Sequence, residues 1–389
     1  MSADRDRTPA DRTRGGRAPT GRPLREPRLL RGSYPPDDVT LLLTDLTGRV
    51  APQPMADVAR LARRTAGRGH RGVVPVEDPP TAATQALFEE LLAAGAREVA
   101  LLSCVLARRV ADAHPGEVVV VSIARAGTPV GVILHRLLRD RYRRRSSHYS
   151  ISLVPGLDLD VDALRLVLGR HPAHALRFVD GWSGKGGIAR LLSAELARVE
   201  PLLRATFAPE LALLADPGRV TTLCATRDDV LIPSALLNAT VSGLFSRSLV
   251  CDLLGPGDPH GAVRYPDLAA WDCSARFVDT VCAAAERIGE EEVGRAGRPA
   301  TRAGRPDFHG WAFMEGLAKE FGMPSMVSFV KPGLNETCRA LVARRPARVL
   351  VDPARRSAAL DVVVRLARER GVTVEERPMP YAAIGLAEG

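Results

Sequence analysis

Residues 180–187 read DGWSGKGG and combine an acid, a hydroxyl, a lysine and four glycines. This segment follows the apolar run LRFV and precedes an apolar pattern with the period of a helix. Glycine-rich turns between a strand and a helix often hold a phosphate, because bare backbone N–H groups and the helix N-terminus favour an anion. The segment therefore predicts a phosphate-binding turn, with the Asp180 carboxylate beside it.

Two well-known phosphate loops do not fit this turn. The Walker A loop has a glycine six positions before its lysine and a hydroxyl residue after it. Here Gly181 lies four positions before Lys185, and Gly186 follows the lysine. The dinucleotide-binding pattern of three spaced glycines after a first strand is also missing. A different kind of phosphate turn is therefore expected.

A second turn of similar character occurs earlier, in the sequence ARAGTP at residues 124–129. It follows VVVVSI (118–123), a β-branched run typical of a strand buried on both faces. The Arg125 guanidinium could bind two pyrophosphate oxygens at once, and Gly127 would let the backbone approach them. Thr128 adds a hydroxyl to the same turn. The two turns together predict a diphosphate-bearing ligand.

The elements that would position these turns alternate along the chain. Helical periodicity covers about 54–67 and 82–110 and resumes at 130, while apolar runs at 146–154, 175–180, 210–216 and 229–234 resemble strands. Repeated strand–turn–helix units predict an α/β fold, with a mostly parallel sheet and helices on both faces.

The region from about 31 to 285 resembles a known family. The segments RGSYPPDDVTLLL, VSIARAGTPVGVIL and FVDGWSGKGGI are similar to StiP-type phosphoribosyltransferase-like proteins, encoded near tellurite-resistance (Ter) stress operons. The resemblance implies a type I phosphoribosyltransferase-like sheet. It also implies an enzyme that transfers ribose phosphate from phosphoribosyl pyrophosphate, with Mg²⁺, to a nucleobase or nucleoside in a stress response.

The resemblance also assigns roles to the two turns. Asp180 would bind the ribose hydroxyls, Lys185 either phosphate group, and Arg125 the pyrophosphate, as the catalytic residues. The remaining donor-binding residues would be Gly127 and Thr128 at the pyrophosphate and, at the 5-phosphate, Ser183, Gly184, Gly186 and Gly187. No residues are predicted to form a permanent metal site.

Two other functions remain open at this stage. One is a nucleotide sensor without catalysis, whose output is RNA binding. The other is a cysteine protease or hydrolase, a label that some members of the family carry. Its nucleophile would be Cys224 or Cys251, and its base His260 or His148. Neither cysteine lies at a glycine-flanked turn, so buried structural thiols are the simpler expectation.

Residues 234–246 place four polar side chains four positions apart, which predicts one face of a helix. These residues are Ser234, Asn238, Ser242 and Ser246. The face could line a nucleobase pocket, or it could allow close packing against a neighbouring helix.

The last 60 residues form a second compact unit. Helical patterns at 334–345 and 357–370 alternate with strand patterns, which predicts a small three-layer α/β/α module. The segment KPGLNETCRALV and the closing AIGL resemble the Pelota-like RNA-binding domain. That resemblance assigns RNA contacts to Gly333, Asn335, Glu336 and Arg339, although Asn335 and Glu336 could instead simply cap a helix.

Composition sets the wider limits. The 389 residues carry a net charge of +9. Nine arginines against four acids give residues 1–31 a charge of +5, and eleven basic residues against seven acids give residues 331–389 a charge of +4. We expect a disordered basic tail (1–31), a phosphoribosyltransferase-like domain (32–289), a linker with a short helix (290–326) and a Pelota-like domain (327–389). Structured RNA is the expected partner, and a homodimer is left open.

No apolar run approaches the length of a membrane span, and the six cysteines include no CxxC pair. The chain is therefore expected to be cytoplasmic, with reduced thiols and no contact with a membrane.

Overall fold

The computed structural model describes residues 27–54, 57, 73–155, 158–298, 306–322, 329–343 and 346–386. Most of the predicted basic tail and of the predicted helix at 54–67 lies outside these residues, as does 299–305 of the predicted linker.

The larger unit is built on a six-stranded sheet in the order β1-β4-β3-β7-β8-β9. Every neighbouring pair in it is parallel, which confirms the predicted parallel sheet. In chain order the strands are β1 (Thr40–Leu41), β3 (Val118–Ile123), β4 (Ser146–Ile151), β7 (Leu176–Trp182), β8 (Leu211–Ala215) and β9 (Cys224–Thr226).

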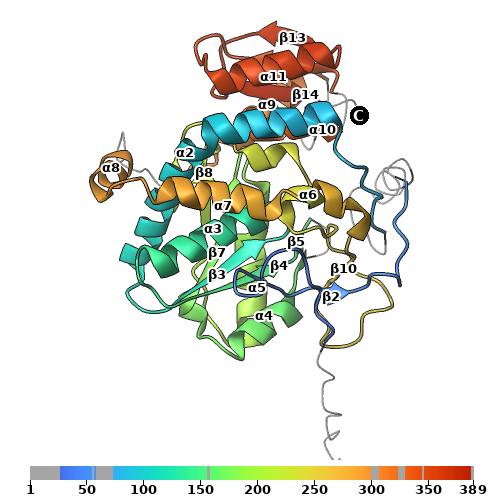
Figure 1. Cartoon of the computed structure of the whole chain (residues 1–389), viewed down its shortest axis with the longest axis vertical. Helices are drawn as coiled ribbons and strands as arrows, with labels where there is room; N and C mark the ends of the chain where they lie inside the picture. The colour runs from blue at the N-terminus through green and yellow to red at the C-terminus, as the bar shows by residue number, and fades with distance from the viewer. Residues whose placement is uncertain are drawn as a thin grey trace, which may run out of the picture.

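Helices cover both faces of this sheet (Figure 1). Val118 and Val120 of β3 pack into the cluster that contains α2 (Ala82–Ala113), α3 (Gly127–Asp140) and α7 (Ser274–Ala285). Val119 and Val121 pack into the opposite cluster, with α4 (Val161–Leu168) and α5 (Gly187–Leu203). All six residues of β3 are buried, because alternate side chains of a strand point to opposite faces.

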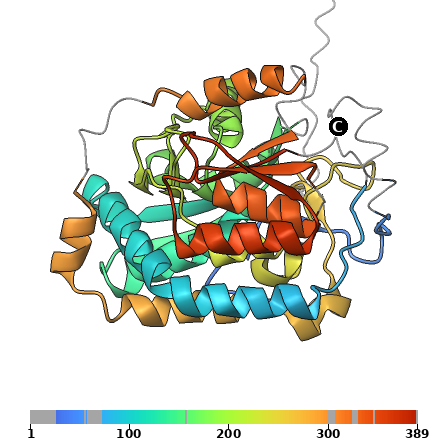
Figure 2. The same ribbon diagram turned by 90° about the horizontal axis from the view of Figure 1, so that it is seen from above.

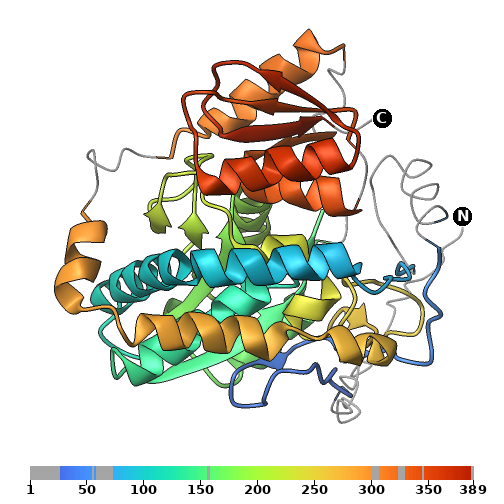
Figure 3. The same ribbon diagram turned by 45° about the horizontal axis from the view of Figure 1, so that its top comes forward.

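The smaller unit has three layers. Its sheet, in the order β11-β14-β12-β13, lies between α9 on one face and α10 with α11 on the other (Figure 3). Helix α9 falls within the predicted linker, yet it packs on this sheet. The elements are α9 (His309–Glu320), β11 (Val330–Pro332), α10 (Gly333–Ala343), β12 (Arg348–Val351), α11 (Ala358–Glu369), β13 (Thr373–Glu376) and β14 (Ala383–Leu386).

The remaining elements of the larger unit are short. Strand β10 pairs with β2 in parallel, and β5 with β6 in an antiparallel hairpin. They are β2 (Thr44–Asp45), β5 (Leu153–Val154), β6 (Asp158–Leu159), β10 (Gly261–Ala262), η1 (Ala173–Ala175), η2 (Pro233–Leu236), η3 (Pro266–Trp271), α6 (Ala239–Ser242) and α8 (Glu290–Ala296).

Two predictions in this region were wrong. Residues 229–234 form no strand, and residues 234–246 do not form one helix. The chain makes the 3-10 turn η2 and then the short helix α6, with Asn238 between them at φ −112° and ψ −105°. Apolar content alone could not separate a buried turn from a buried strand.

The two units are packed together rather than merely connected. Figure 2 shows the smaller unit lying over the larger one. Leu334, Cys338 and Leu341 of α10 belong to the same buried cluster as α2 and α3. The apolar core therefore runs continuously from one unit to the other, and removing it from water stabilises the docked arrangement.

Candidate functional site

The glycine-rich turn after β7 lies beneath the smaller unit. The O atom of Gly184 accepts a hydrogen bond from the Tyr381 hydroxyl at 2.6 Å. A Cβ atom at Gly184 would lie 2.6 Å from the Pro332 carbonyl oxygen, and one at Gly186 would lie 2.9 Å from the Phe308 ring. Ser183 is buried, and only Gly187 of the predicted phosphate-binding residues faces open space. The neighbouring unit therefore packs directly against the turn that was expected to bind a phosphate.

Asp180 and Lys185 line the same junction. Asp180 Oδ1 accepts a hydrogen bond from the Gly181 N–H at 2.8 Å. Burial raises the pKa of Asp180 to about 7, although Arg339 favours the charged form. The Lys185 Nζ donates to the Val330 carbonyl at 3.1 Å, and burial lowers the pKa of Lys185 to about 8. Lys185 thus contacts strand β11 of the smaller unit.

The turn after β3 lies beside Asp180, as the shared sheet edge predicts. A Cβ atom at Gly127 would lie 2.8 Å from the Val179 carbonyl oxygen and 3.2 Å from the Asp180 Cα, so only glycine allows this approach. Thr128 is fully buried and shares a 2.8 Å hydrogen bond with Ser150. Arg125 forms an ion pair with Glu77 and donates to the Phe245 carbonyl at 3.0 Å. Its guanidinium is therefore already engaged within the fold.

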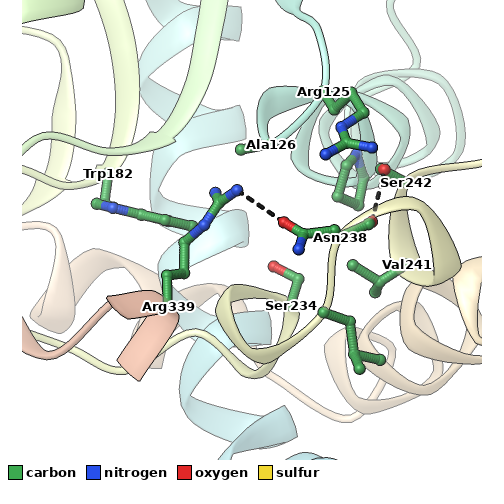
Figure 4. Close-up of a pocket in the computed structure, with 10 residues that line it drawn as sticks. Arg125, Ala126, Trp182, Ser234, Asn238, Val241, Ser242 and Arg339 are labelled. Atoms are coloured by element: carbon green, nitrogen blue, oxygen red, sulfur yellow. Dashed lines mark hydrogen bonds between the residues drawn. The ribbon is translucent and has the colours of Figure 1, made fainter. Parts of the chain in front are cut away.

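A small polar cavity of about 10 Å³ lies between this turn and α10 (Figure 4). The Arg339 guanidinium enters it from α10, with its carbon 5.8 Å from the centre of the Trp182 ring. Arg339 also donates to Asn238 Oδ1 at 3.1 Å. The polar lining comprises Arg125, Trp182, Ser234, Asn238, Ser242 and Arg339.

The four residues expected to bind RNA lie at the start of α10, against the larger unit. The Asn335 side chain is 3% exposed and is hydrogen-bonded to the backbone of Val230 and Ile232. Gly333 has φ +86° and lies beside Asp229. Glu336 is partly buried close to Asp180 and Arg339, and it raises the pKa of Asp180. Asn335 and Arg339 thus bind the larger unit in this arrangement.

The thiols differ in their surroundings. Burial raises the pKa of Cys104, Cys224 and Cys282 to about 11 and of Cys338 to about 12, and it also raises that of Cys273. Because the thiolate is the nucleophile, these five positions are poorly suited to attack. Cys251 is partly exposed and lies in the loop that leads to His260.

The two candidate histidines also differ. His148 is buried, with Nε2 on the Ser122 hydroxyl at 2.8 Å and Nδ1 on the Asp38 carbonyl at 2.7 Å. Burial lowers the pKa of His148 to about 3, so this ring is a structural, neutral group. The His260 ring is partly exposed, and its Nδ1 lies 2.9 Å from the Ser152 hydroxyl. Among the described residues no thiol is hydrogen-bonded to a histidine ring.

Two acids important at the junction were missed in the sequence. Glu77 binds Arg125 and accepts from the Ala239 N–H at 3.0 Å, and Asp229 accepts from two N–H groups of the smaller unit. Both lie in irregular segments with no periodic pattern. The apolar residues after Asp229 could have indicated that its carboxylate is buried, but they do not predict which groups are hydrogen-bonded to it.

Fold and site together define a class: a mixed α/β protein of two packed units, with a polar cavity at their junction and mostly buried thiols. The chain belongs to the family described as tellurite-like stress resistance cysteine protease StiP, whose model matches residues 32–282. A second family model, the PELOTA RNA binding domain, matches residues 308–388.

The chain is 28% identical over 369 residues to the protein named cysteine protease StiP of Acinetobacter baylyi (strain ATCC 33305 / BD413 / ADP1). The alignment covers 92% of this chain and 94% of the relative. No solved structure matches.

These findings correct the predicted activity. The expectation of a phosphoribosyltransferase was wrong, because the family and the relative are both named for cysteine protease activity. The covered turn gives a physical reason, since Pro332 and Phe308 pack against the glycines that were expected to bind the donor phosphate. The expectation of Mg²⁺ came with that donor and stays a prediction. The resemblances to StiP-type proteins and to the Pelota RNA-binding domain are confirmed.

In the part of the chain that the structure describes, the helices are too short or too polar to span a bilayer.

Proposed function

We propose that this protein is a thiol-dependent hydrolase, a cysteine protease that acts in a tellurite-like stress response. Membership of the StiP family and the name of the Acinetobacter relative support the reaction class. A hydrolase of this class uses a cysteine thiol as its nucleophile, and the matched segment of the larger unit contains such thiols.

The backbone pairing of Leu249 with Gly261 carries the assignment of the nucleophile and the base. Leu249 and Gly261 exchange two hydrogen bonds, of 2.9 and 2.8 Å. Cys251 lies two residues beyond Leu249, and His260 adjoins Gly261, so this antiparallel pair brings the two backbones to the same end of the loop. Because successive positions of a paired strand point to opposite faces, the proposal requires the loop to turn the Cys251 side chain toward the His260 ring. Cys251 is the nucleophile in this proposal, and His260 is the base.

His260 is held in place from three sides. Its N–H donates to Asp160 Oδ2 at 2.6 Å, its carbonyl accepts from the Thr44 N–H at 2.9 Å, and its Nδ1 meets Ser152. The Nε2 atom has no hydrogen-bond partner among the described residues. An imidazole held at one nitrogen can exchange a proton through the other, which is what a thiol nucleophile needs.

The test is proteolysis of fluorescein-labelled casein by the full chain. Cys251→Ala should lower the rate at least 100-fold, because no other group supplies the covalent intermediate. Cys282→Ala is the matched control, since Cys282 is also partly exposed but its thiol pKa is raised. An unchanged rate in Cys251→Ala would remove Cys251 from this role. Cleavage by a variant lacking all six thiols would overturn the hydrolase mechanism itself.

We propose a second function, RNA binding by the smaller unit. The match to the PELOTA RNA binding domain supports it, as does the net positive charge of residues 331–389. Arg355, Arg356, Arg368 and Arg370 are exposed on this unit and could contact phosphates. Binding to a labelled RNA hairpin should weaken steeply as salt rises. Affinity that does not change between 50 and 200 mM salt would contradict a phosphate-based contact.

A further inference from the structure

Residues 229–232 of the larger unit present the smaller unit with an anion and, beside it, a hydrogen-bond acceptor and donor. The first group is a carboxylate at a helix N-terminus. Asp229 Oδ1 accepts from the Leu334 N–H at 2.9 Å, and Oδ2 accepts from the Ala382 N–H at 3.0 Å. A helix start favours a negative group, and in a nucleic-acid complex that group is a phosphate.

The second feature is a neighbouring pair of backbone groups, one acceptor and one donor, and the Asn335 side-chain amide is hydrogen-bonded to both. Its Nδ2 donates to the Val230 carbonyl at 2.7 Å, and its Oδ1 accepts from the Ile232 N–H at 2.8 Å. An asparagine side chain pairs with the edge of adenine through this same combination of one acceptor and one donor. The backbone of Val230 and Ile232 therefore satisfies Asn335 in the way a base edge would.

The third contact involves Arg339, the arginine of the same helix. Arg339 lies over the Trp182 ring and donates to Asn238, so it also binds an aromatic face and an amide of the larger unit. Arginine stacked on a ring system is a common contact to unpaired bases. Leu334, which lies between these polar groups, is 1% exposed in the shared apolar core. RNA could not reach this surface while the units are docked.

We propose that residues 229–232 act as an internal nucleotide mimic, so that RNA and the larger unit compete for the start of α10. This inference rests on the proposed RNA binding by the smaller unit. In the docked state the start of α10 is occupied, and its contacts to RNA form only in the undocked state. RNA binding then uncovers Trp182, the glycine-rich turn and the cavity at the junction. The apparent affinity of the full chain for RNA is then the affinity of the undocked state multiplied by the fraction of molecules that are undocked.

The test compares two neighbouring acids in the full chain. Asp229→Ala removes the mimic of the phosphate, whereas Asp228→Ala removes the same charge at an exposed position bonded to Thr226. The probe is a fluorescent pool of RNA hairpins interrupted by randomised internal loops, because single-stranded loops expose base edges. Asp229→Ala should bind the pool at least tenfold more tightly than the wild type, and Asp228→Ala should bind like the wild type.

Hydrogen exchange at the Ile232 amide reports opening independently, because this amide donates across the junction to Asn335 and not to Asp229. If exchange at this amide stays slow in Asp229→Ala, Asp229→Arg provides a second variant, since a cation at the helix start opposes docking. Equal RNA affinity in docked and opened proteins would overturn the competition while leaving RNA binding intact. No RNA binding by any opened variant would overturn RNA binding and the inference with it.

Discussion

A glycine with a positive φ angle stands at the start of both α5 and α10: Gly186, at 84°, directly precedes α5, and Gly333, at 86°, is the first residue of α10. The sequence predicts a phosphate at the start of α5, and the resemblance to the Pelota-like domain predicts RNA contacts at the start of α10. The start of α5 is covered by side chains, since a Cβ at Gly186 would lie 2.7 Å from Val220 and 2.9 Å from Phe308. The start of α10 instead receives the Asp229 carboxylate.

The difference teaches what a glycine-initiated helix does and does not encode. A left-handed glycine sets the direction in which the chain enters the helix. Whether its N–H groups then meet an anion, an acid of the same chain or an apolar cover depends on residues far away in sequence. Phe308 and Asp229 are 122 and 104 positions from the glycines they contact. A local motif therefore could not decide between these outcomes.

Gly184→Ala should have the largest effect on the α5 side of this comparison. The added Cβ would lie 2.6 Å from a backbone carbonyl oxygen, that of Pro332, which cannot rotate away as a side chain can. We expect a loss of about 2–3 kcal/mol in the free energy of unfolding and faster exchange along β11. Gly187→Ala is the control, since no atom lies within 4 Å of its Cβ position. Thermal unfolding measures both, and equal melting temperatures would show that the turn is not sealed.

Gly333→Ala tests the α10 side. A side chain there would adopt φ +86° and approach Asp229 Oδ1 to 2.9 Å. The strain should cost about 1–2 kcal/mol of docking free energy and raise the RNA affinity of the full chain. Gly316→Ala in α9 faces open space and should do neither. A drop in stability without any gain in RNA affinity would argue against competition at this helix.

Much of the fold could be predicted because its pattern is local. The run VVVVSI gave β3 at the expected residues, and the periodic segments gave α2, α3, α10 and α11 within a few residues. The exceptions were segments without a distinctive period. Residues 229–234 are apolar but form a turn, where Pro233 begins η2. A proline can start a helical turn but cannot donate to a sheet.

The candidate site was less predictable than the fold. The sequence correctly brought Arg125, Gly127 and Asp180 to one edge of the sheet. It could not show that a second unit would be packed over that edge, because docking depends on Tyr381, Pro332 and Asn335 meeting groups more than 100 residues away. The sequence of each unit, taken alone, predicted an external ligand for the glycine-rich turn and another for the start of α10. In the structure these two surfaces lie at the junction and contact the other unit.

Asp180→Asn tests whether burial at the junction carries an electrostatic cost. The folded-state pKa of about 7 lies above the ordinary value of 3.8, so the folded protein binds more protons than the unfolded chain between about pH 4 and 7. Stability from this group therefore falls as pH rises through that window. Asparagine keeps an acceptor for the Gly181 N–H without the charge. The melting temperature should rise by a few degrees at pH 8 and stay unchanged at pH 4. A rise of the same size at both pH values would mean that packing, not charge, limits this position.

Tyr381→Phe should have the smallest effect, because it removes one hydrogen bond from the cover over α5 and leaves the ring in place. The Tyr381 hydroxyl donates to the Gly184 carbonyl at 2.6 Å, while its ring packs against Phe313 in the core of the smaller unit. Losing a buried hydrogen bond costs about 1 kcal/mol, so the melting temperature should fall by only a few degrees. RNA affinity should rise less than in Gly333→Ala, because the bond seals α5 and does not touch the start of α10. An RNA affinity that rises as much as in Gly333→Ala would show that the two helix starts open together, as one cooperative interface, and not as two separate covers.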